Sequence, residues 1–145
     1  MNHLLYANTA DNRYATLFFA DYEDTARRLR YANCGHNPPL LLRAGGCLKR
    51  LAATAVPLGM FADWNCEIAE LELHPGDVMV MYTDGVTEAE SDAGEFFGEQ
   101  RLIDALLANA LRPPAALLET IAKTVQTFSG SEQEDDITLV IARCL

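Results

Sequence analysis

The sequence lacks a long apolar run, which excludes some classes of protein at the outset. No stretch of about eighteen consecutive apolar residues, the length that a membrane-spanning helix needs, occurs along the 145 positions. The first residues, MNHLLYANTADNRY, have neither a basic start nor the long apolar segment of a signal peptide. We therefore expect no membrane span and predict a soluble, cytoplasmic protein.

Cysteine motifs are also missing. The four cysteines form no CxxC pair and no Cys–His spacing typical of zinc sites, so neither a zinc site nor a disulfide framework is indicated; they are Cys34, Cys47, Cys66 and Cys144. Cys34 precedes His36 closely, but no CxxxxxR phosphate loop surrounds it. We interpret Cys34 as a structural thiol rather than a nucleophile.

Positive charge is scarce. The chain has 11 Lys and Arg residues against 21 Asp and Glu residues, a formal net charge of −10. Nucleic-acid binders need a basic face, and anionic membranes attract basic segments, so neither partner is expected. The densest acidic stretch, EAESDAGEFFGE at 88–99, is typical of a solvated face. It also invites a Ca²⁺-binding interpretation, although it lacks the spaced acids and terminal Glu of an EF-hand.

Short apolar runs of β type are present in the first half. YATLFFA at 14–20 and RRLRYANCG at 27–35, joined by the turn DYEDTA, predict one hairpin. LLLR and CLKRL, separated by Gly45-Gly46, predict a second. NCEIAELEL and VMVMYTDG are joined by His-Pro-Gly-Asp at 74–77, and because Pro and Gly favour a tight turn, we predict that these two strands pair antiparallel.

The second half of the chain changes to helical periodicity. Residues 98–111 and 113–128 each repeat apolar residues at helical spacing, and the second stretch begins with proline, which is common in the first helical turn. A loop of Ser, Gly and acids then leads into a strand at 137–142. We predict one domain over 1–145, of α+β class, with helices lying on a mostly antiparallel sheet.

Carboxylates stand at the ends of two apolar strands. Asp84 follows one strand, and Asp135 and Asp136 precede another. If these strands are antiparallel neighbours, the three side chains meet at one edge of the sheet. Clustered carboxylates repel each other unless a cation neutralises them, and oxygen ligands favour Mg²⁺, Mn²⁺ or Ca²⁺ over zinc. A divalent metal site is one interpretation; ordinary loop carboxylates are the other, since Asp-Gly is a common turn.

Five ordered motifs resemble those of one phosphatase family. YANCGHNPPLLL, PLGM, YTDGVTEA, GEFFGEQRL and EDDITLVIAR, in this order and at these distances, resemble the SpoIIE-type bacterial branch of the metal-dependent (type-2C) serine/threonine protein phosphatases over residues 14–143. The resemblance implies an α-β-β-α sandwich of antiparallel sheets flanked by helices. It also implies two Mn²⁺ or Mg²⁺ ions and a bridging water that attacks phosphoserine or phosphothreonine in line, without a covalent phosphoenzyme.

The resemblance also suggests roles for the carboxylates. Asp84 and Asp135 become metal ligands, and Gly85 lets the chain turn beside the metal without a Cβ. Asp136 takes a supporting role through hydrogen bonds, although the sequence leaves open which of the two neighbouring aspartates points inward.

The turn NCGHNPP has two interpretations. His36 stands where eukaryotic relatives carry a metal-binding Asp, so His36 and Asn33 could form a site loop that orients phosphate or water. In the other interpretation, which the residue types favour, Asn33 and His36 satisfy backbone groups of a turn at the end of a strand.

One part of the family pattern is missing. The first metal motif, Asp-x-Ser-Gly-His/Lys-Gly, has no counterpart here, and ADYEDTA does not replace it. We therefore expect a truncated phosphatase domain whose N-terminal part is missing, with little activity and weak Mn²⁺ binding of its own. The alternative is a degenerate member, a non-catalytic pseudophosphatase that serves as a protein-interaction module. The missing strands would also leave an unpaired sheet edge, which favours self-association.

The resemblance finally implies a biological setting. Members of this branch typically act in signal transduction that regulates sigma factors, where the phosphorylated protein substrate is an anti-sigma-factor antagonist. A sensory or receiver domain upstream in the full-length protein is also expected.

Overall fold

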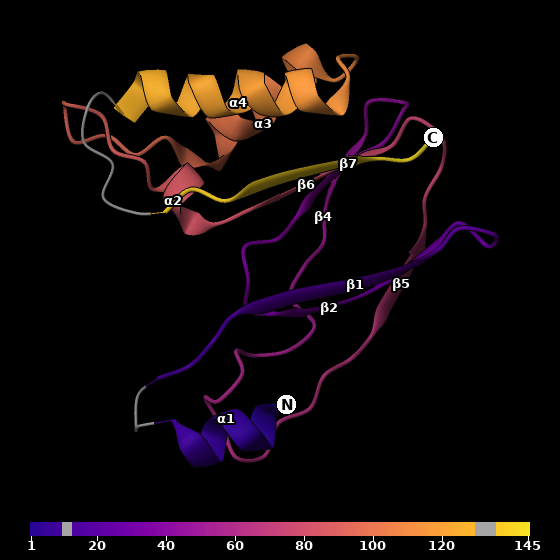
Figure 1. Cartoon of the computed structure of the whole chain (residues 1–145), viewed down its shortest axis with the longest axis vertical. Coiled ribbons are helices and arrows are strands. Elements are labelled where there is room, and N and C mark those ends of the chain that lie inside the picture. Colours follow the sequence, from indigo (N-terminus) through magenta and orange to yellow (C-terminus); the bar gives the residue numbers. More distant parts are fainter. Residues whose placement is uncertain (10–12, 130–135) are drawn as a thin grey trace. The chain divides into compact units, whose positions relative to one another are not determined.

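The computed structural model contains two compact units and describes residues 1–9, 13–129 and 136–145. The first unit comprises Met1–Pro38 and Arg50–His74, and the second comprises Pro39–Lys49 and Pro75–Leu145. A three-stranded antiparallel sheet lies in the first unit and a four-stranded sheet in the second (Figure 1).

In chain order, the described elements are α1 (Asn2–Asn8), β1 (Leu17–Glu23), β2 (Arg28–Cys34), β3 (Leu40–Leu42), β4 (Leu48–Arg50), β5 (Ala69–Glu72), β6 (Val78–Tyr82), α2 (Asp84–Thr87), α3 (Gly98–Asn109), α4 (Pro114–Ser129) and β7 (Leu139–Arg143).

The sheet of the first unit has the strand order β1-β2-β5. β1 and β2 form the predicted first hairpin, with partners running from Leu17 opposite Cys34 to Glu23 opposite Arg28. Near the turn, Arg28 Nη2 lies 2.6 Å from Glu23 Oε2, and both side chains are about half exposed. Because exposed cross-strand ion pairs contribute little energy, this pair acts mainly on the register of the hairpin.

Helix α1 is anchored by one buried asparagine. Asn2 Nδ2 donates to the carbonyl of Phe61 at 3.0 Å, and Asn2 Oδ1 accepts the Gly59 N–H at 2.7 Å. Leu5 packs against the small cluster of Ala32, Cys34 and Leu58. This helix was not predicted, because the contacts that hold it come from residues far away in the sequence.

The sheet of the second unit has the order β4-β3-β6-β7. β3 and β4 are neighbours, and Arg43 N donates to Cys47 O at 2.8 Å, so the predicted second hairpin is confirmed. β6 is a central strand, in which Val80 lies opposite Leu40 of β3 and Ile141 of β7.

The predicted pairing across the His-Pro-Gly-Asp turn is wrong. A turn is present at Pro75-Gly76, but β5 joins the sheet of the first unit, whereas β6 joins that of the second. Consecutive residues Val78, Met79 and Val80 of β6 are all buried, so this strand needs a central position in a sheet. β5 alternates half-buried with exposed residues, which suits an edge strand. The turn is where the chain passes from one unit to the other.

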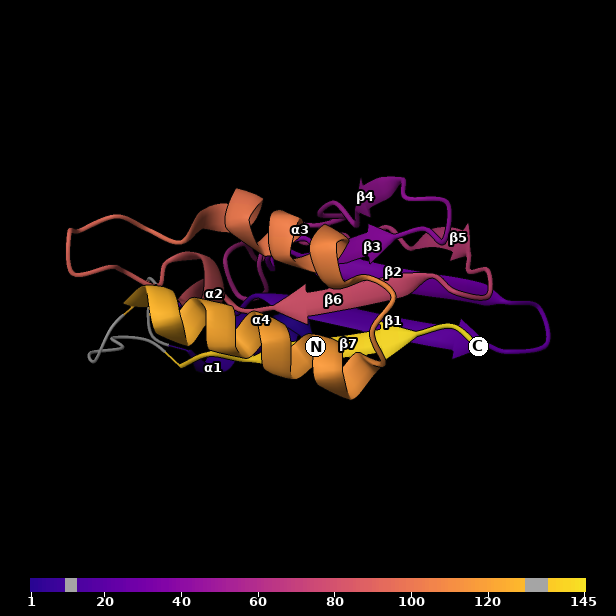
Figure 2. The ribbon, with the colours of Figure 1, turned by 90° about the horizontal axis from the view of Figure 1, so that it is seen from above.

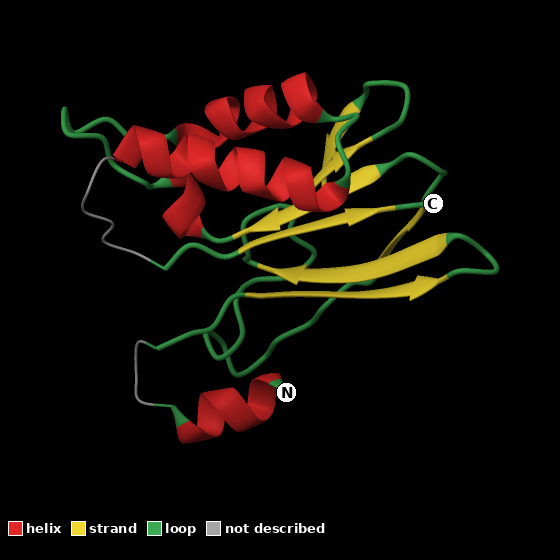
Figure 3. Cartoon of the chain, turned by 45° about the horizontal axis from the view of Figure 1, so that its top comes forward, coloured by secondary structure: helices red, strands yellow, loops and turns green. Residues whose placement is uncertain are grey.

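Helices α3 and α4 lie on one face of the four-stranded sheet (Figures 2 and 3). Their apolar stripes bury Leu102, Leu106, Leu117, Ile121 and Val125 in the same core as Val78 and Val80. Both helices were predicted and are confirmed, with ends that differ by one or two residues. Within the described ranges, no helix has the length and apolar character needed to cross a membrane.

Candidate metal site

The end of β6 carries the aspartate around which the site was predicted. β6 ends at Tyr82, and after Thr83 the chain starts the short helix α2 at Asp84 (Figure 1). Asp84 is exposed, whereas Gly85 and Val86 are buried. The carboxylate that follows this apolar strand is therefore exposed to solvent at the end of the four-stranded sheet.

Antiparallel pairing brings the start of β7 to the same place. Tyr82 lies opposite Leu139, so these strands are antiparallel neighbours, which was the condition for their carboxylates to meet. Asp136, three residues before β7, is exposed at this edge, and Asp135 lies outside the described residues. The assignments of Asp84, Asp135, Gly85 and Asp136 to a metal site stay predictions.

Thr83 joins the two strand ends. Its hydroxyl accepts the Thr138 N–H at 3.0 Å and donates to the Asp136 carbonyl at 3.2 Å. Its backbone N–H donates to the Thr138 carbonyl at 3.1 Å. The Thr83 side chain thus holds the backbone of Asp136 next to Thr83, which directly precedes Asp84. Thr83 was not recognised from sequence, because its partners lie more than fifty residues further along the chain.

Removing the Thr83 hydroxyl should loosen this edge. We expect Thr83→Val to lose both hydroxyl hydrogen bonds and to lower the free energy of unfolding by about 1–2 kcal/mol. Thr83→Ser keeps the hydroxyl and should stay close to the wild type. Urea unfolding measures the loss, and amide hydrogen exchange at Thr138 locates it; wild-type protection of that amide in Thr83→Val would contradict the bridging role.

The described residues supply one carboxylate that suits a metal site. Asp84 offers an exposed carboxylate, and Gly85 N–H donates to its Oδ1 at 3.1 Å. Oxygen ligands of this kind suit Mg²⁺ or Mn²⁺. In the described part of the chain, however, no group of three His, Cys, Asp or Glu side chains is placed to hold a metal ion. A complete site therefore requires more carboxylates than the described residues supply.

The turn after β2 is fixed by Asn33. This side chain is fully buried; its Nδ2 donates to the Leu51 carbonyl at 3.0 Å, and its Oδ1 accepts the His36 N–H at 2.9 Å. His36 Nδ1 lies 3.4 Å from Thr16 Oγ1. The contacts of Asn33 are those of the interpretation in which it satisfies the backbone of the turn. A role of His36 in orienting phosphate stays a prediction.

Gly35 in this turn has no room for a side chain. Its φ is +72°, and a Cβ would lie 2.6 Å from Pro57 Cγ. We expect Gly35→Ala to lower the free energy of unfolding by about 2–3 kcal/mol, measured by urea denaturation. Gly46→Ala is the matched control, because its φ is +85° but no described atom lies within 4 Å of the added Cβ. It should cost about 1 kcal/mol. Equal losses would show that contact with Pro57 is irrelevant.

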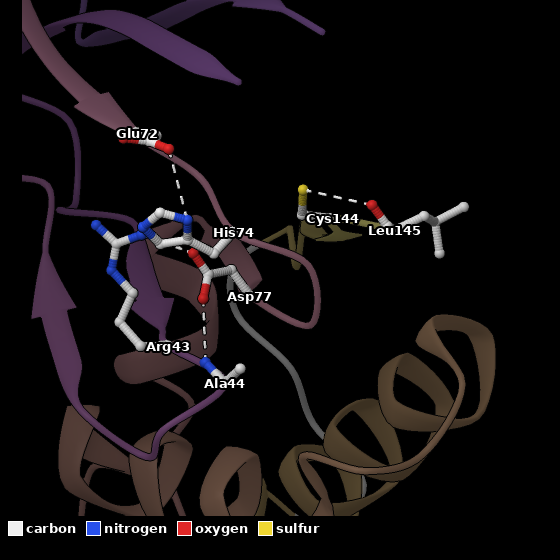
Figure 4. Close-up of polar contacts among 7 residues, drawn as sticks. All are labelled: Arg43, Ala44, Glu72, His74, Asp77, Cys144 and Leu145. Carbon is white, nitrogen blue, oxygen red and sulfur yellow. Dashed lines mark hydrogen bonds and ion pairs between the residues drawn. The ribbon is translucent and has the colours of Figure 1, made fainter. Parts of the chain in front are cut away.

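A second acidic residue, at the opposite end of β6, was not recognised from sequence. Asp77 is 2% exposed, and its Oδ2 lies 2.6 Å from Arg43 Nη1 while its Oδ1 accepts the Ala44 N–H at 3.0 Å (Figure 4). Its backbone carbonyl accepts the Cys144 N–H at 2.9 Å. Asp77 thus ties the β3–β4 turn and the end of β7 to the start of β6. The sequence indicated a turn residue, and the signal overlooked was an acid directly before a fully apolar strand.

Comparisons with known proteins agree on one family. The family model described as Stage II sporulation protein E (SpoIIE) matches residues 1–145. Protein IcfG of Synechocystis sp. (strain ATCC 27184 / PCC 6803 / Kazusa) is 38% identical over 127 residues, which cover 88% of this chain and 20% of IcfG. Phosphoserine phosphatase RsbU of Bacillus subtilis (strain 168) is 25% identical over 146 residues, 99% of this chain and 43% of RsbU. The chain therefore spans less than half the length of these two relatives.

The solved structures agree on the fold. The phosphatase domain of the cell fate determinant SpoIIE from Bacillus subtilis, presoaked with Mn, superimposes with a TM-score of 0.74 at 20% identity; the match covers 98% of this chain and 62% of that one. The predicted class, antiparallel sheets with helices in a phosphatase-like fold, is confirmed. Together with the match over its whole length, this shows that the chain belongs to the SpoIIE family.

Proposed function

We propose that this chain is part of the catalytic domain of a Mn²⁺- or Mg²⁺-dependent protein phosphatase that hydrolyses phosphoserine or phosphothreonine. The observation that carries the proposal is the shared edge of β6 and β7, where Asp84 is exposed and Thr83 holds the backbone of Asp136. The relationship to a phosphoserine phosphatase supports it. The proposed substrate is a phosphorylated anti-sigma-factor antagonist, in a protein that also has a sensory or receiver domain.

In this proposal some residues where β6 ends and β7 begins bind the metal ions, and another positions the two strands. Asp84 and Asp135 hold the ions, and Thr83 keeps the start of β7 against the end of β6. When bound, Mn²⁺ or Mg²⁺ supplies positive charge for the phosphate oxygens and lowers the pKa of a coordinated water. Because a complete ligand set needs further carboxylates, we propose that full activity belongs to a longer protein containing this chain.

The test is metal-dependent release of phosphate. A phosphoserine peptide is incubated with this chain, and separately with the longest gene product that contains it, in Mn²⁺, in EDTA, and in EDTA followed by excess Mn²⁺. We expect the longer protein to release phosphate with Mn²⁺, to stop in EDTA and to recover on refilling, and this chain alone to release little. Phosphate release that is unaffected by EDTA, or no release by the longer protein in any condition, would overturn the proposal.

The second candidate is a non-catalytic interaction module. It is favoured by the described residues lacking a three-residue metal cluster. Binding of the phosphorylated partner by the longer protein, without turnover, would support this candidate over the first.

Self-association through a sheet edge remains part of the proposal. Strand β1 is an edge strand, and its Phe19 and Tyr22 side chains are 62% and 40% exposed. Light scattering of this chain at increasing concentration would detect the association.

A further inference from the structure

Two cysteines that are far apart in the sequence are in contact in the first unit. Cys34 ends β2 and is 1% exposed. Cys66, in the segment before β5, is half-buried and packs against the cluster of Ala32, Cys34 and Leu58. Besides burial, the neighbouring Cys66 also contributes to the raised pKa of the Cys34 thiol. This pair was not predicted, since it belongs to no cysteine motif.

The same short segment holds the backbone near both cysteines. Thr54 N donates to the Asn33 carbonyl at 2.7 Å, Asn33 N donates to Thr54 Oγ1 at 3.0 Å, and Cys34 forms a bridge with Ala55. On the other side, Thr54 Oγ1 lies 3.8 Å from Cys66 Sγ. The contact between the thiols is therefore part of a hydrogen-bonded framework.

We propose that Cys34 and Cys66 are a modification site that forms a reversible disulfide when a hydroperoxide is present. The proposal is independent of the phosphatase assignment, since it concerns residues that no step of that reaction uses. It applies to the protein under oxidative conditions, because thiols in reducing compartments stay reduced.

The chemistry balances with hydrogen peroxide as the oxidant. The Cys66 sulfur attacks the peroxide, the O–O bond breaks, and the products are the Cys66 sulfenic acid and one water. The Cys34 sulfur then attacks the Cys66 sulfur, the S–O bond breaks, and the hydroxide leaves as water with the Cys34 proton. In total, two thiols lose two protons and two electrons, and one peroxide becomes two waters.

The difference in burial sets the order of these steps. Burial, together with the neighbouring Cys66, raises the pKa of the Cys34 thiol to about 11. At neutral pH Cys34 is therefore an inert thiol that peroxide reaches poorly, and the more accessible Cys66 reacts first. Cys34 then resolves the sulfenic acid at short range, where proximity compensates for its low thiolate fraction.

Mass spectrometry can test the pair directly. The background is the full chain with Cys47→Ser and Cys144→Ser, which removes the two thiols of the second unit. The folded protein is treated with hydrogen peroxide, quenched with N-ethylmaleimide in denaturant and digested with trypsin. Cys34 and Cys66 fall in different tryptic peptides, residues 31–43 and 51–101. We expect the two peptides to be linked, with a mass two hydrogens below their sum, and dithiothreitol to separate them.

Two controls make the result decisive. Cys66→Ser in the same background should leave Cys34 fully labelled by N-ethylmaleimide, since the buried thiol does not react alone. Peroxide treatment in 8 M urea should lower the linked fraction at least tenfold, because unfolding separates the two sulfurs. The proposal is overturned if both thiols are labelled after oxidation of the folded protein, if Cys66 proceeds to sulfinic acid without linkage, or if linkage is equally frequent in urea.

Discussion

Replacing Asp84 by Asn should abolish Mn²⁺-dependent phosphate release in the longest gene product that contains this chain. The amide keeps the size of the side chain but removes the charge that attracts a divalent cation. Metal ions contribute several kcal/mol to a reaction of this type, so we expect phosphate release to fall at least about a hundredfold. Phosphate release at saturating phosphopeptide measures the effect, and calorimetric titration with Mn²⁺ measures binding without turnover.

We expect Asp84→Asn to leave the stability of the fold unchanged. Asp84 is exposed, so the free energy of unfolding of Asp84→Asn, measured by urea denaturation, is expected to stay within about 0.5 kcal/mol of the wild type. Asp92→Asn is the matched control, because it removes the same charge from an exposed residue of the acidic stretch. It should leave phosphate release and Mn²⁺ binding unchanged. Wild-type turnover by Asp84→Asn would remove Asp84 from the metal site.

Asp77→Ala should be the most destabilising of the substitutions considered. It leaves Arg43 without its 2.6 Å partner and the Ala44 N–H without its acceptor, in a place where the carboxylate itself is 2% exposed. We expect a loss of about 3 kcal/mol, at the low end of the range for a broken buried pair because the Arg43 side chain is 26% exposed. Differential scanning calorimetry should show a fall of about 10 °C in Tm.

Glu23→Ala isolates the contribution of burial. Glu23 also lies 2.6 Å from an arginine, Arg28, but the two side chains are 44% and 46% exposed. Its loss should cost less than about 1 kcal/mol, because water replaces the arginine as a partner. If Asp77→Ala and Glu23→Ala shifted Tm equally, Asp77 would not anchor the start of β6.

The sequence could predict the elements whose apolar residues recur at regular spacing. The apolar stripes of α3 and α4 recur at helical spacing, and each helix could be located to within two residues. The relation between Asp84 and Asp136 also followed from local pattern, since two apolar strands with acids at opposite ends place those acids at one edge when they pair antiparallel.

The features that were predicted wrongly or missed depend on contacts between residues far apart in the sequence. The turn before Asp77 predicts a reversal of the chain, but it does not say which sheet the next strand joins. In the structure β6 pairs with β3 and β7, and consecutive residues such as Val78 and Met79 are buried, as in strands whose two faces are both covered. Helix α1 depends on Asn2 and its distant backbone partners, and the contact between Cys34 and Cys66 depends on how the loop around Thr54 folds.

The hydrogen bonds of Thr83 have a consequence for biosynthesis. The residue that completes this edge, Thr138, is added to the chain 55 positions after Thr83. Until β7 has been synthesised, only β3 of the two strands that flank β6 in the structure is available to pair with it. The carboxylate of Asp84 is therefore present long before the aspartates that precede β7, and a nascent chain that stops short of β7 exposes an apolar strand edge to chaperones and to other nascent chains.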